Sequence, residues 1–220
     1  MTRLYSYTVH TDDGAAPNPF HGMCTLAICK PRIRSTAQIG DWIAGLGSKN
    51  APTGDLSGKL VYAMRVQDTI SMADYDGRAK AEWPHRLPDI TSRDLADRLG
   101  DCIYDFSSGA PPRQRLGVHS KANIQTDLRG KSVLISRDFY YFGSAAEPLP
   151  NYLMPICHQT QGHKSTANAP YVGLFEKWIR SLGNPGGQIY GWPGHVIDWS
   201  EERISCGCIS RAEDDDEEAC

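Results

Sequence analysis

Short apolar segments separated by Gly and Pro constrain the fold of this 220-residue chain most strongly. The segments 4–9 (LYSYTV), 24–29 (CTLAIC), 39–46 and 59–66 (KLVYAMRV) are rich in β-branched, aromatic and aliphatic residues, as strands are. The 14 Pro and 21 Gly of the chain predict many turns. We therefore expect a loop-rich α+β protein rather than a helical bundle.

The strand-like segments predict a mostly antiparallel sheet. A polar loop with several Gly and Pro joins 39–46 to 59–66, which favours an antiparallel hairpin. Pro31 ends the segment 24–29, and strand character returns at 132–136 (SVLIS) and 139–142 (FYYF). The expected fold is compact and strand-rich, with a few helices and long loops.

The clearest helix is predicted over 171–182, with Gly183 as its C-terminal stop. A shorter helix is expected over 91–99, with Thr91 as its N-cap, whereas 105–130 and 144–170 are predicted to be loops. The apolar residues of the long helix share one face at helical spacing: Val172, Phe175, Trp178, Ile179 and Leu182.

The net charge of −3 conceals an uneven distribution. The run Glu213–Glu218 supplies six acidic residues, and the rest of the chain has 20 Asp and Glu against 23 Lys and Arg. We predict a single mildly basic domain over 1–205, followed by an acidic tail without regular structure over 206–220. A basic domain is compatible with a nucleotide or nucleic-acid ligand.

The chain has no apolar run long enough to span a membrane, and its first residues lack the apolar core of a signal peptide. Its seven cysteines are therefore expected to be mostly reduced thiols. These features predict a cytoplasmic protein without a membrane partner.

Several signatures of common enzymes are absent from the sequence. Residues 130–132 (GKS) end like a P-loop, but Gln125 stands where its first glycine is needed. The sequence also lacks the dinucleotide-binding GxGxxG pattern after a strand, the zinc-deaminase pattern and the Gly-x-Ser-x-Gly nucleophile elbow.

Histidine and cysteine at 21, 24 and 29 are donors that zinc prefers. In a continuous strand, however, Cys24 and Cys29 point to opposite faces, which favours small buried residues over metal ligands. Cys206, Cys208 and Cys220 lie near the acidic end of the chain. We therefore predict no metal site, and the sequence indicates no particular cofactor.

Three residues are candidates for acid–base catalysis. His21 follows a turn bounded by proline, Asp41 follows a glycine at the start of a predicted strand, and His163 lies beside Lys164 in a polar loop. Each has an ordinary alternative as a turn or solvated loop residue.

Basic and aromatic side chains are candidates for binding a nucleotide. In an extended chain, alternating Lys30, Arg32 and Arg34 would share one face and bind phosphate, and a second basic set lies at 113–121. Tyr140 or Tyr141 offers a ring for base stacking, although in a strand one of each alternating pair packs in the core. The candidate ligand-binding residues are Asn18, Lys30, Arg34, Ser48, Tyr140, Tyr141 and Lys164.

Six sequence blocks occur in order between Leu4 and Leu182: APNPFHGMCTLAICKPRIR, IGDWIAGLGSK, KLVYAMRV, GDCIYDF, VLISRDFYYFG and GHK before a Val/Phe/Trp helix. In this combination the chain resembles the nucleotide modification associated domain, type two. Such domains occur in phages and bacteria and are associated with making or handling modified nucleic-acid bases. The resemblance implies that setting and transfers no catalytic residue. The Gly-Asp-Trp strand, the Gly-Lys loop and the VYAMRV strand also resemble the small barrels of PUA and EVE modules, which bind modified bases.

Two functions from different classes follow. The first is a nucleotide- or nucleic-acid-handling protein for modified-base biosynthesis or recognition, which stacks a base on an aromatic ring and holds phosphate with Lys and Arg. Whether it is an enzyme or a binding module stays open. The alternative is a phage or host interaction protein that acts through its surface and acidic tail without nucleotide chemistry.

Overall fold

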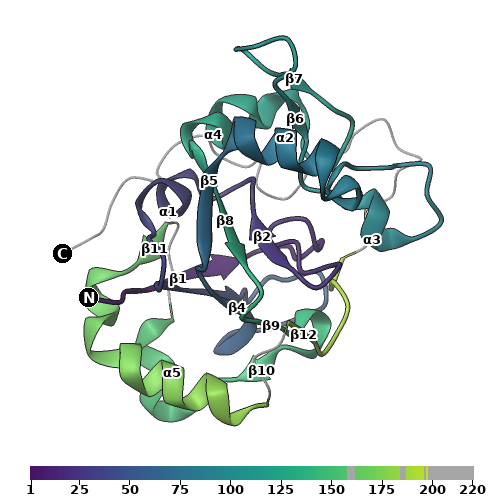
Figure 1. Cartoon of the computed structure of the whole chain (residues 1–220). Coiled ribbons are helices and arrows are strands. Elements are labelled where there is room, and N and C mark those ends of the chain that lie inside the picture. The colour runs from purple at the N-terminus through teal and green to yellow at the C-terminus, as the bar shows by residue number, and fades with distance from the viewer. Residues whose placement is uncertain (158–161, 184–186, 196, 198–220) are drawn as a thin grey trace.

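A computed structural model of the chain describes residues 1–157, 162–183, 187–195 and 197, which form four layers. Helix α5 (Val172–Ser181) covers one face of a seven-stranded sheet, and a three-stranded sheet packs on the other face (Figure 1). Helices α2 (Met72–Ala81) and α4 (Ile124–Arg129) cover the outer face of the smaller sheet.

The larger sheet mixes parallel and antiparallel pairs. β1 pairs in parallel with β3, and β9 with β12, whereas β1–β11, β3–β4, β4–β9 and β4–β10 are antiparallel. Its strands, in spatial order, are β11 (His163–Lys164), β1 (Leu4–Val9), β3 (Trp42–Gly47), β4 (Lys59–Arg65), β9 (Phe139–Tyr141) and β12 (Gln188–Ile189), with β10 (Glu147–Pro148) beside β4.

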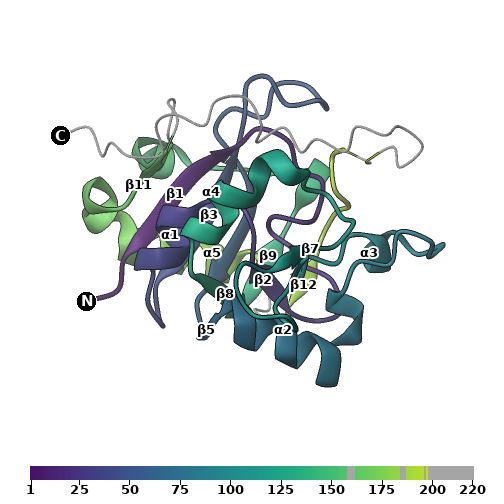
Figure 2. The ribbon, with the colours of Figure 1, turned by 90° about the horizontal axis from the view of Figure 1, so that it is seen from above.

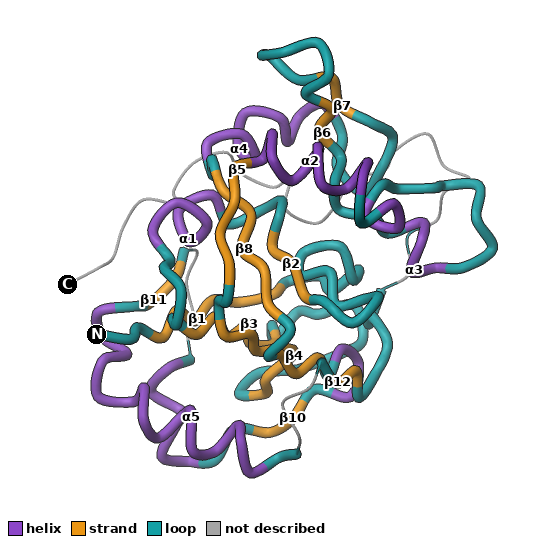
Figure 3. The backbone as a smooth tube through the Cα atoms, viewed as in Figure 1, coloured by secondary structure: helices purple, strands orange, loops and turns teal. Residues whose placement is uncertain are grey.

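The smaller sheet is antiparallel, and its strands run in a different direction from those of the larger sheet (Figure 3). It contains, in order, β2 (Cys24–Leu26), β8 (Ser132–Ser136) and β5 (Asp68–Ser71). The remaining elements are α1 (Pro31–Thr36), α3 (Leu95–Arg98), the pair β6 (Tyr104–Asp105) and β7 (Arg113–Gln114), and the 3₁₀ turns η1 (Pro84–Arg86), η2 (Lys121–Asn123), η3 (Gly143–Ala145), η4 (Asn151–Ile156) and η5 (Thr166–Tyr171).

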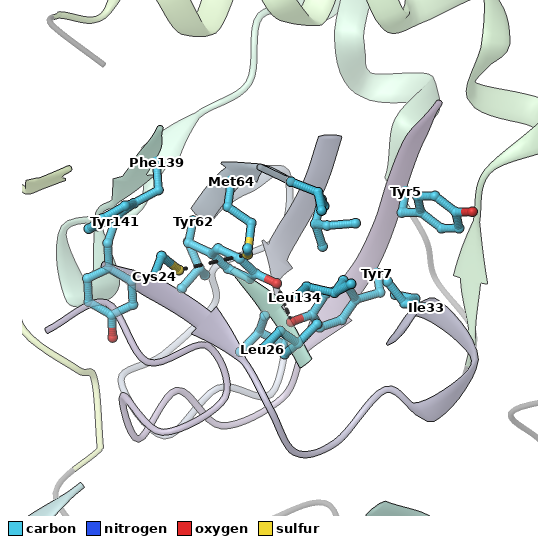
Figure 4. Close-up of a cluster of buried hydrophobic side chains, with 14 of the residues drawn as sticks. Tyr5, Tyr7, Cys24, Leu26, Ile33, Tyr62, Met64, Leu134, Phe139 and Tyr141 are labelled. Atoms are coloured by element: carbon cyan, nitrogen blue, oxygen red, sulfur yellow. Dashed lines mark hydrogen bonds between the residues drawn. The ribbon is translucent and has the colours of Figure 1, made fainter. Parts of the chain in front are cut away.

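Alternation along the strands builds the core between the two sheets. Tyr7 of β1 and Tyr62 of β4 both point inward, and their hydroxyl oxygens lie 2.8 Å apart (Figure 4). Leu26 and Leu134 of the smaller sheet pack against them. The opposite face of β1 carries Leu4, which packs in the separate core beneath α5.

Much of the predicted architecture is confirmed. The protein is a mixed α and β structure with a strand-rich sheet, a few helices and long connections. The first strand, the hairpin of β3 and β4 and helix α5 lie where the sequence predicts them. A small PUA- or EVE-like barrel is not confirmed, because the strands of the described residues do not close into a barrel.

The prediction for residues 24–36 is wrong after the first three residues. β2 ends at Leu26, Cys29 and Lys30 adopt left-handed backbone conformations with φ of 58° and 39°, and α1 begins at Pro31. Proline suits the first position of a helix because its missing N–H has no partner there. Lys30, Arg32 and Arg34 therefore do not lie on one extended face.

Local structure also differs at three later places. The helix predicted over 91–99 is shortened to α3, because Asp94 rather than Thr91 caps it through a bond from the Ala96 N–H. The stretch 105–130 contains β7, η2 and α4, and 144–170 contains short strands and 3₁₀ turns. Tertiary packing orders these segments, which carry little local periodicity.

Among the described cysteines, Cys24, Cys29, Cys102 and Cys157 are not in disulfide bonds. The acidic tail and Cys206, Cys208 and Cys220 lie outside the described residues, and the predicted 1–205 domain boundary stays a prediction. Within the described part of the chain, every helix is too short or too polar to cross a bilayer.

Stability should depend on pH through Asp12. Burial raises the pKa of this carboxyl to about 7, although Tyr141 donates hydrogen bonds of 2.8 and 2.7 Å to its two oxygens. The folded state thus holds a proton that the unfolded chain has released between about pH 4 and pH 7, so stability falls as the pH rises through this window.

We expect Asp12→Asn to remove roughly 2–4 kcal/mol of this fall, measured as the difference in unfolding free energy by urea titration at about pH 4 and pH 8. Asp55→Asn is the control, because hydrogen bonds from Ser57 lower the pKa of that exposed carboxyl out of the window. Equal pH slopes in the wild type and Asp12→Asn would contradict the prediction.

Candidate active site

The candidates Asn18 and His21, which both precede β2, lie in different surroundings. Asn18 is buried, and its Oδ1 accepts a 2.7 Å hydrogen bond from the buried Arg86. His21 is exposed, with Nε2 3.3 Å from Oδ1 of Asp97 and its ring against that of His85 at a centroid distance of 4.2 Å and a tilt of 34°. A ligand or catalytic role for either residue stays a prediction.

Asp41 and Ser48 hold local structure at the two ends of β3. The buried Asp41 carboxylate accepts bonds from the backbone N–H groups of Arg3 at 2.8 Å and Gln38 at 3.0 Å. The Ser48 hydroxyl lies 3.4 Å from Nδ1 of His10. Catalysis by Asp41 and ligand binding by Ser48 stay predictions.

The alternation expected in β9 is present, but both faces of the strand are buried. Tyr141 points between the two sheets, and its hydroxyl donates to Asp12. Tyr140 points toward α5, and its hydroxyl donates to the Gly183 carbonyl at 3.4 Å. Base stacking on either ring would require the core to open.

Three basic or imidazole candidates lie around β1. His163 of β11 is opposite Tyr7 in the sheet, and Lys30 places its Nζ 4.8 Å from the centre of the same tyrosine ring. Lys164 donates hydrogen bonds to the carbonyls of Pro155 and Cys157. The predicted residues are thus distributed over several parts of the fold.

A different set of residues forms a linear arrangement of thiol, imidazole and carboxylate. The Sγ atom of Cys29 lies 3.3 Å from Nε2 of His119, and Nδ1 of His119 lies 2.5 Å from Oδ2 of Asp127. All three residues are buried. In the tautomer that donates from Nδ1 to Asp127, Nε2 faces the thiol, as nucleophilic catalysis by cysteine requires.

The Asp127 carboxylate organises this triad. In addition to His119, it accepts a 2.8 Å bond from the Cys29 N–H on Oδ1 and a 2.8 Å bond from the Tyr104 hydroxyl on Oδ2. Burial and the neighbouring Asp127 raise the pKa of Tyr104, so the tyrosine remains a donor. The carboxylate therefore holds both the backbone of Cys29 and the orientation of the imidazole.

Cys29 lies at a strained turn between a strand and a helix. Left-handed conformations are unfavourable for residues with a Cβ, and Cys29 and Lys30 adopt two in succession before Pro31. Strain of this kind is often found at functional sites. The strand–turn–helix context is that of a nucleophile elbow, without its Gly-x-Ser-x-Gly sequence.

The buried Arg34 holds this turn against α4 and β8. Its guanidinium donates to the carbonyls of Cys29 at 2.7 Å, of Ser132 at 3.0 Å and of Asp127. Burial lowers the pKa of Arg34, and the charge of Asp127 opposes that change. Arg34, predicted to bind a ligand, thus has a clear structural role beside the triad.

The same three groups also form a candidate metal site, because their donor atoms lie within 4.8 Å of one another. However, the two nitrogens of His119 face different partners, Cys29 and Asp127. One ion contacts only one nitrogen of an imidazole, so a shared metal would require the ring to turn. The arrangement therefore fits proton transfer better than metal binding.

Comparison with known proteins gives one result. The family model described as Nucleotide modification associated domain 2 matches residues 1–202. The chain belongs to this family. No curated protein and no solved structure matches the chain. Membership in the nucleotide modification associated domain 2 family confirms the resemblance in the sequence and associates the protein with nucleotide modification.

The other described thiols of this family member lie in surroundings that disfavour the thiolate. Burial raises the pKa of Cys102 to about 12, and it also raises the pKa of Cys24 and Cys157. Cys24 lies between the sheets, with its Sγ 3.9 Å from the sulfur of Met64. The sequence offered His21, Cys24 and Cys29 as donors that zinc prefers. In the structure these three side chains lie in separate parts of the fold.

Sequence reasoning missed the triad because its members lie in three separate segments. Cys29 reads as the end of a buried strand, and His119 as part of a basic set. The one available signal was Pro31 soon after Cys29, which marks the start of a helix as well as the end of a strand. No local pattern identifies Asp127.

The triad depends on a glycine beside Arg34. A Cβ on Gly130 would collide with the Arg34 guanidinium, whereas a Cβ on Gly77 of α2 would meet no atom within 4 Å. We expect Gly130→Ala to lower the unfolding free energy by about 1–3 kcal/mol. Gly77→Ala should be neutral or stabilising by up to about 1 kcal/mol. Urea unfolding of both variants tests this, and equal stabilities would contradict it.

Proposed function

We propose that this protein is a cysteine-dependent enzyme that acts on a nucleotide or a modified nucleobase. In this proposal Cys29 is the nucleophile, His119 is the general base and acid, and Asp127 orients His119. The observation that carries it is the 3.3 Å contact between Sγ of Cys29 and Nε2 of His119, with Nδ1 held by Asp127. The nucleotide class rests on family membership.

The arrangement suits acyl transfer. Nε2 of His119 takes the thiol proton, and the sulfur of Cys29 bonds to the carbonyl carbon while the C=O electron pair moves to oxygen. When that pair returns, the bond to the leaving group breaks, and the leaving group takes the proton from Nε2. Water or an amine then attacks the resulting thioester with His119 again as base, which releases the acyl group and restores the thiol.

The elements that carry the triad are basic. Helices α1 and α4 lie side by side (Figure 2). The Ser35 hydroxyl donates to the Gly130 carbonyl at 3.1 Å. The segments 29–36 and 119–132 contain one acidic residue, Asp127. Their basic residues are Lys30, Arg32, Arg34, Lys121, Arg129 and Lys131.

This charge favours an anionic substrate, as a nucleotide is. In the proposal, Lys30 and the exposed Arg32 bind phosphate near the nucleophile, which retains the phosphate role that the sequence predicts for Lys30. Stacking of the base on Tyr140 or Tyr141 has less support, because both rings are buried. A cytoplasmic location and a nucleic-acid partner are likewise part of the proposal.

The test is a panel of nucleoside monophosphates and modified-base oligonucleotides, followed by thermal shift and by the mass of the ligand. We expect the wild type and the Cys157→Ser control to change the mass of at least one ligand. Cys29→Ser should bind that ligand with its conversion reduced by at least about a thousandfold.

Two outcomes would contradict the proposal in different ways. Binding without any change in ligand mass, or equal conversion by Cys29→Ser, would indicate a binding module or a catalytic residue elsewhere. Absence of a thermal shift with every nucleotide would favour the interaction protein that the sequence leaves as an alternative.

A further inference from the structure

Helices α1 and α4 bring three exposed basic side chains together. Arg129 and Lys131 flank Gly130, whose carbonyl accepts a 3.1 Å hydrogen bond from the Ser35 hydroxyl of α1. Arg32 lies three residues before Ser35, and residues at this spacing share one side of a helix. Arg32, Arg129 and Lys131 therefore gather on one surface, here called the α1–α4 face.

The described carboxylates do not neutralise the α1–α4 face. Elsewhere on the protein, Arg115 is paired with Asp76 at 2.6 Å. Among the described residues, no carboxylate forms an ion pair with Arg129 or Lys131. Asp127, the acidic residue of α4, is buried in the triad. The face therefore attracts anions.

The acidic run Glu213–Glu218 carries the opposite charge on six consecutive residues. It begins 16 residues after 197, the last residue that the structure describes. A chain of that length spans up to about 55 Å when extended, whereas a folded domain of about 200 residues has a radius of gyration of about 16 Å. Six extended residues span about 20 Å, and packed helices have axes about 8–10 Å apart. The run is therefore long enough to cross both helices of the α1–α4 face, and its place in the chain allows it to reach them.

We propose that the acidic run docks on the α1–α4 face and competes there with anionic ligands of the protein. A surface ion pair is weak on its own and is screened by salt. Attachment to the same chain compensates for this weakness, because it presents the run at an effective concentration on the order of millimolar.

The docked run raises the ligand charge that binding requires. A ligand with several phosphates displaces the run, whereas a weakly charged ligand does not. That the ligand is a nucleotide, held in part by Arg32, rests on the proposed function, but the docking itself does not.

The first test needs no ligand. The full chain is compared with a variant in which the acidic run is neutralised by Glu213→Gln, Asp214→Asn, Asp215→Asn, Asp216→Asn, Glu217→Gln and Glu218→Gln. At about 20 mM salt, we expect neutralisation to shift the backbone amide NMR resonances of α1 and of residues 129–131. At about 500 mM salt, the resonances of these residues should coincide in the two proteins, because salt screens surface ion pairs.

Two pairs of substitutions show which basic residues hold the run. In a protein with Arg129→Gln and Lys131→Gln, neutralisation of the run should no longer shift the resonances of α1. The matched control is Lys49→Gln with Arg93→Gln, because these exposed residues lie in other loops, before β4 and before α3. The control protein should respond as the wild type does.

Unchanged resonances in the rest of each spectrum verify that the variants are folded. If the resonances of α1 and of residues 129–131 stay unchanged at low salt, or if both pairs of substitutions respond equally, the docking is wrong.

The second test measures competition by calorimetric titration with inorganic triphosphate at about 20 mM salt. We expect neutralisation of the run to raise the affinity at least about tenfold, because a face occupied in about nine molecules out of ten binds with a tenfold lower apparent affinity. Equal affinity, or no binding by the neutralised variant, would overturn the competition. Neither test involves turnover, so failure of the chemistry proposed for Cys29 is a separate result, which Cys29→Ser decides.

Discussion

The geometry of the candidate active site depends on one buried carboxylate. Asp127 accepts hydrogen bonds from the Cys29 N–H, from Nδ1 of His119 and from the Tyr104 hydroxyl. A buried carboxylate without such donors would be costly, so each of these bonds also stabilises the fold. The groups that position the nucleophile are therefore the same groups that make burial of Asp127 tolerable. In the proposed function, catalysis and stability are therefore coupled at this residue, and a change there affects both.

The layered fold brings the hydrogen-bond donors of Asp127 together. The smaller sheet separates the core beneath α2 from the core between the sheets, and the strained turn at Cys29 leaves this sheet at the end nearest α1 and α4. Arg34 then joins that turn to α4 and β8 through three carbonyl oxygens. Gly130 leaves room for the Arg34 guanidinium and so allows α1 and α4 to approach closely. The triad requires this close approach. The same approach collects the basic residues that favour an anionic substrate.

The sequence predicted the parts of this structure that local patterns determine. The alternating β-branched and aromatic residues of 4–9 predict β1, and the 3.6-residue period of 171–182 predicts α5, which buries its apolar face against the larger sheet. Cys29 shows the limit of such reasoning. The run CTLAIC reads as one strand, whereas the turn at Cys29 is held by Arg34 and by Asp127, which lies 98 residues away. Contacts between residues so far apart in the chain produce no recognisable spacing pattern in the sequence. Family membership supplied the nucleotide context, which no single residue shows.

The central claim is that Asp127 and His119 prepare Cys29 as a nucleophile. Ultraviolet absorbance of the thiolate, measured against Cys29→Ser across the neutral pH range, tests it without a substrate. The account predicts a thiolate signal at neutral pH in the wild type that Asp127→Asn loses, because an uncharged amide does not stabilise the His119 imidazolium that pairs with the thiolate. Asp12→Asn, whose site lies apart from the triad, should keep the signal. No signal in the wild type, or an unchanged signal in a folded Asp127→Asn variant, would contradict the account.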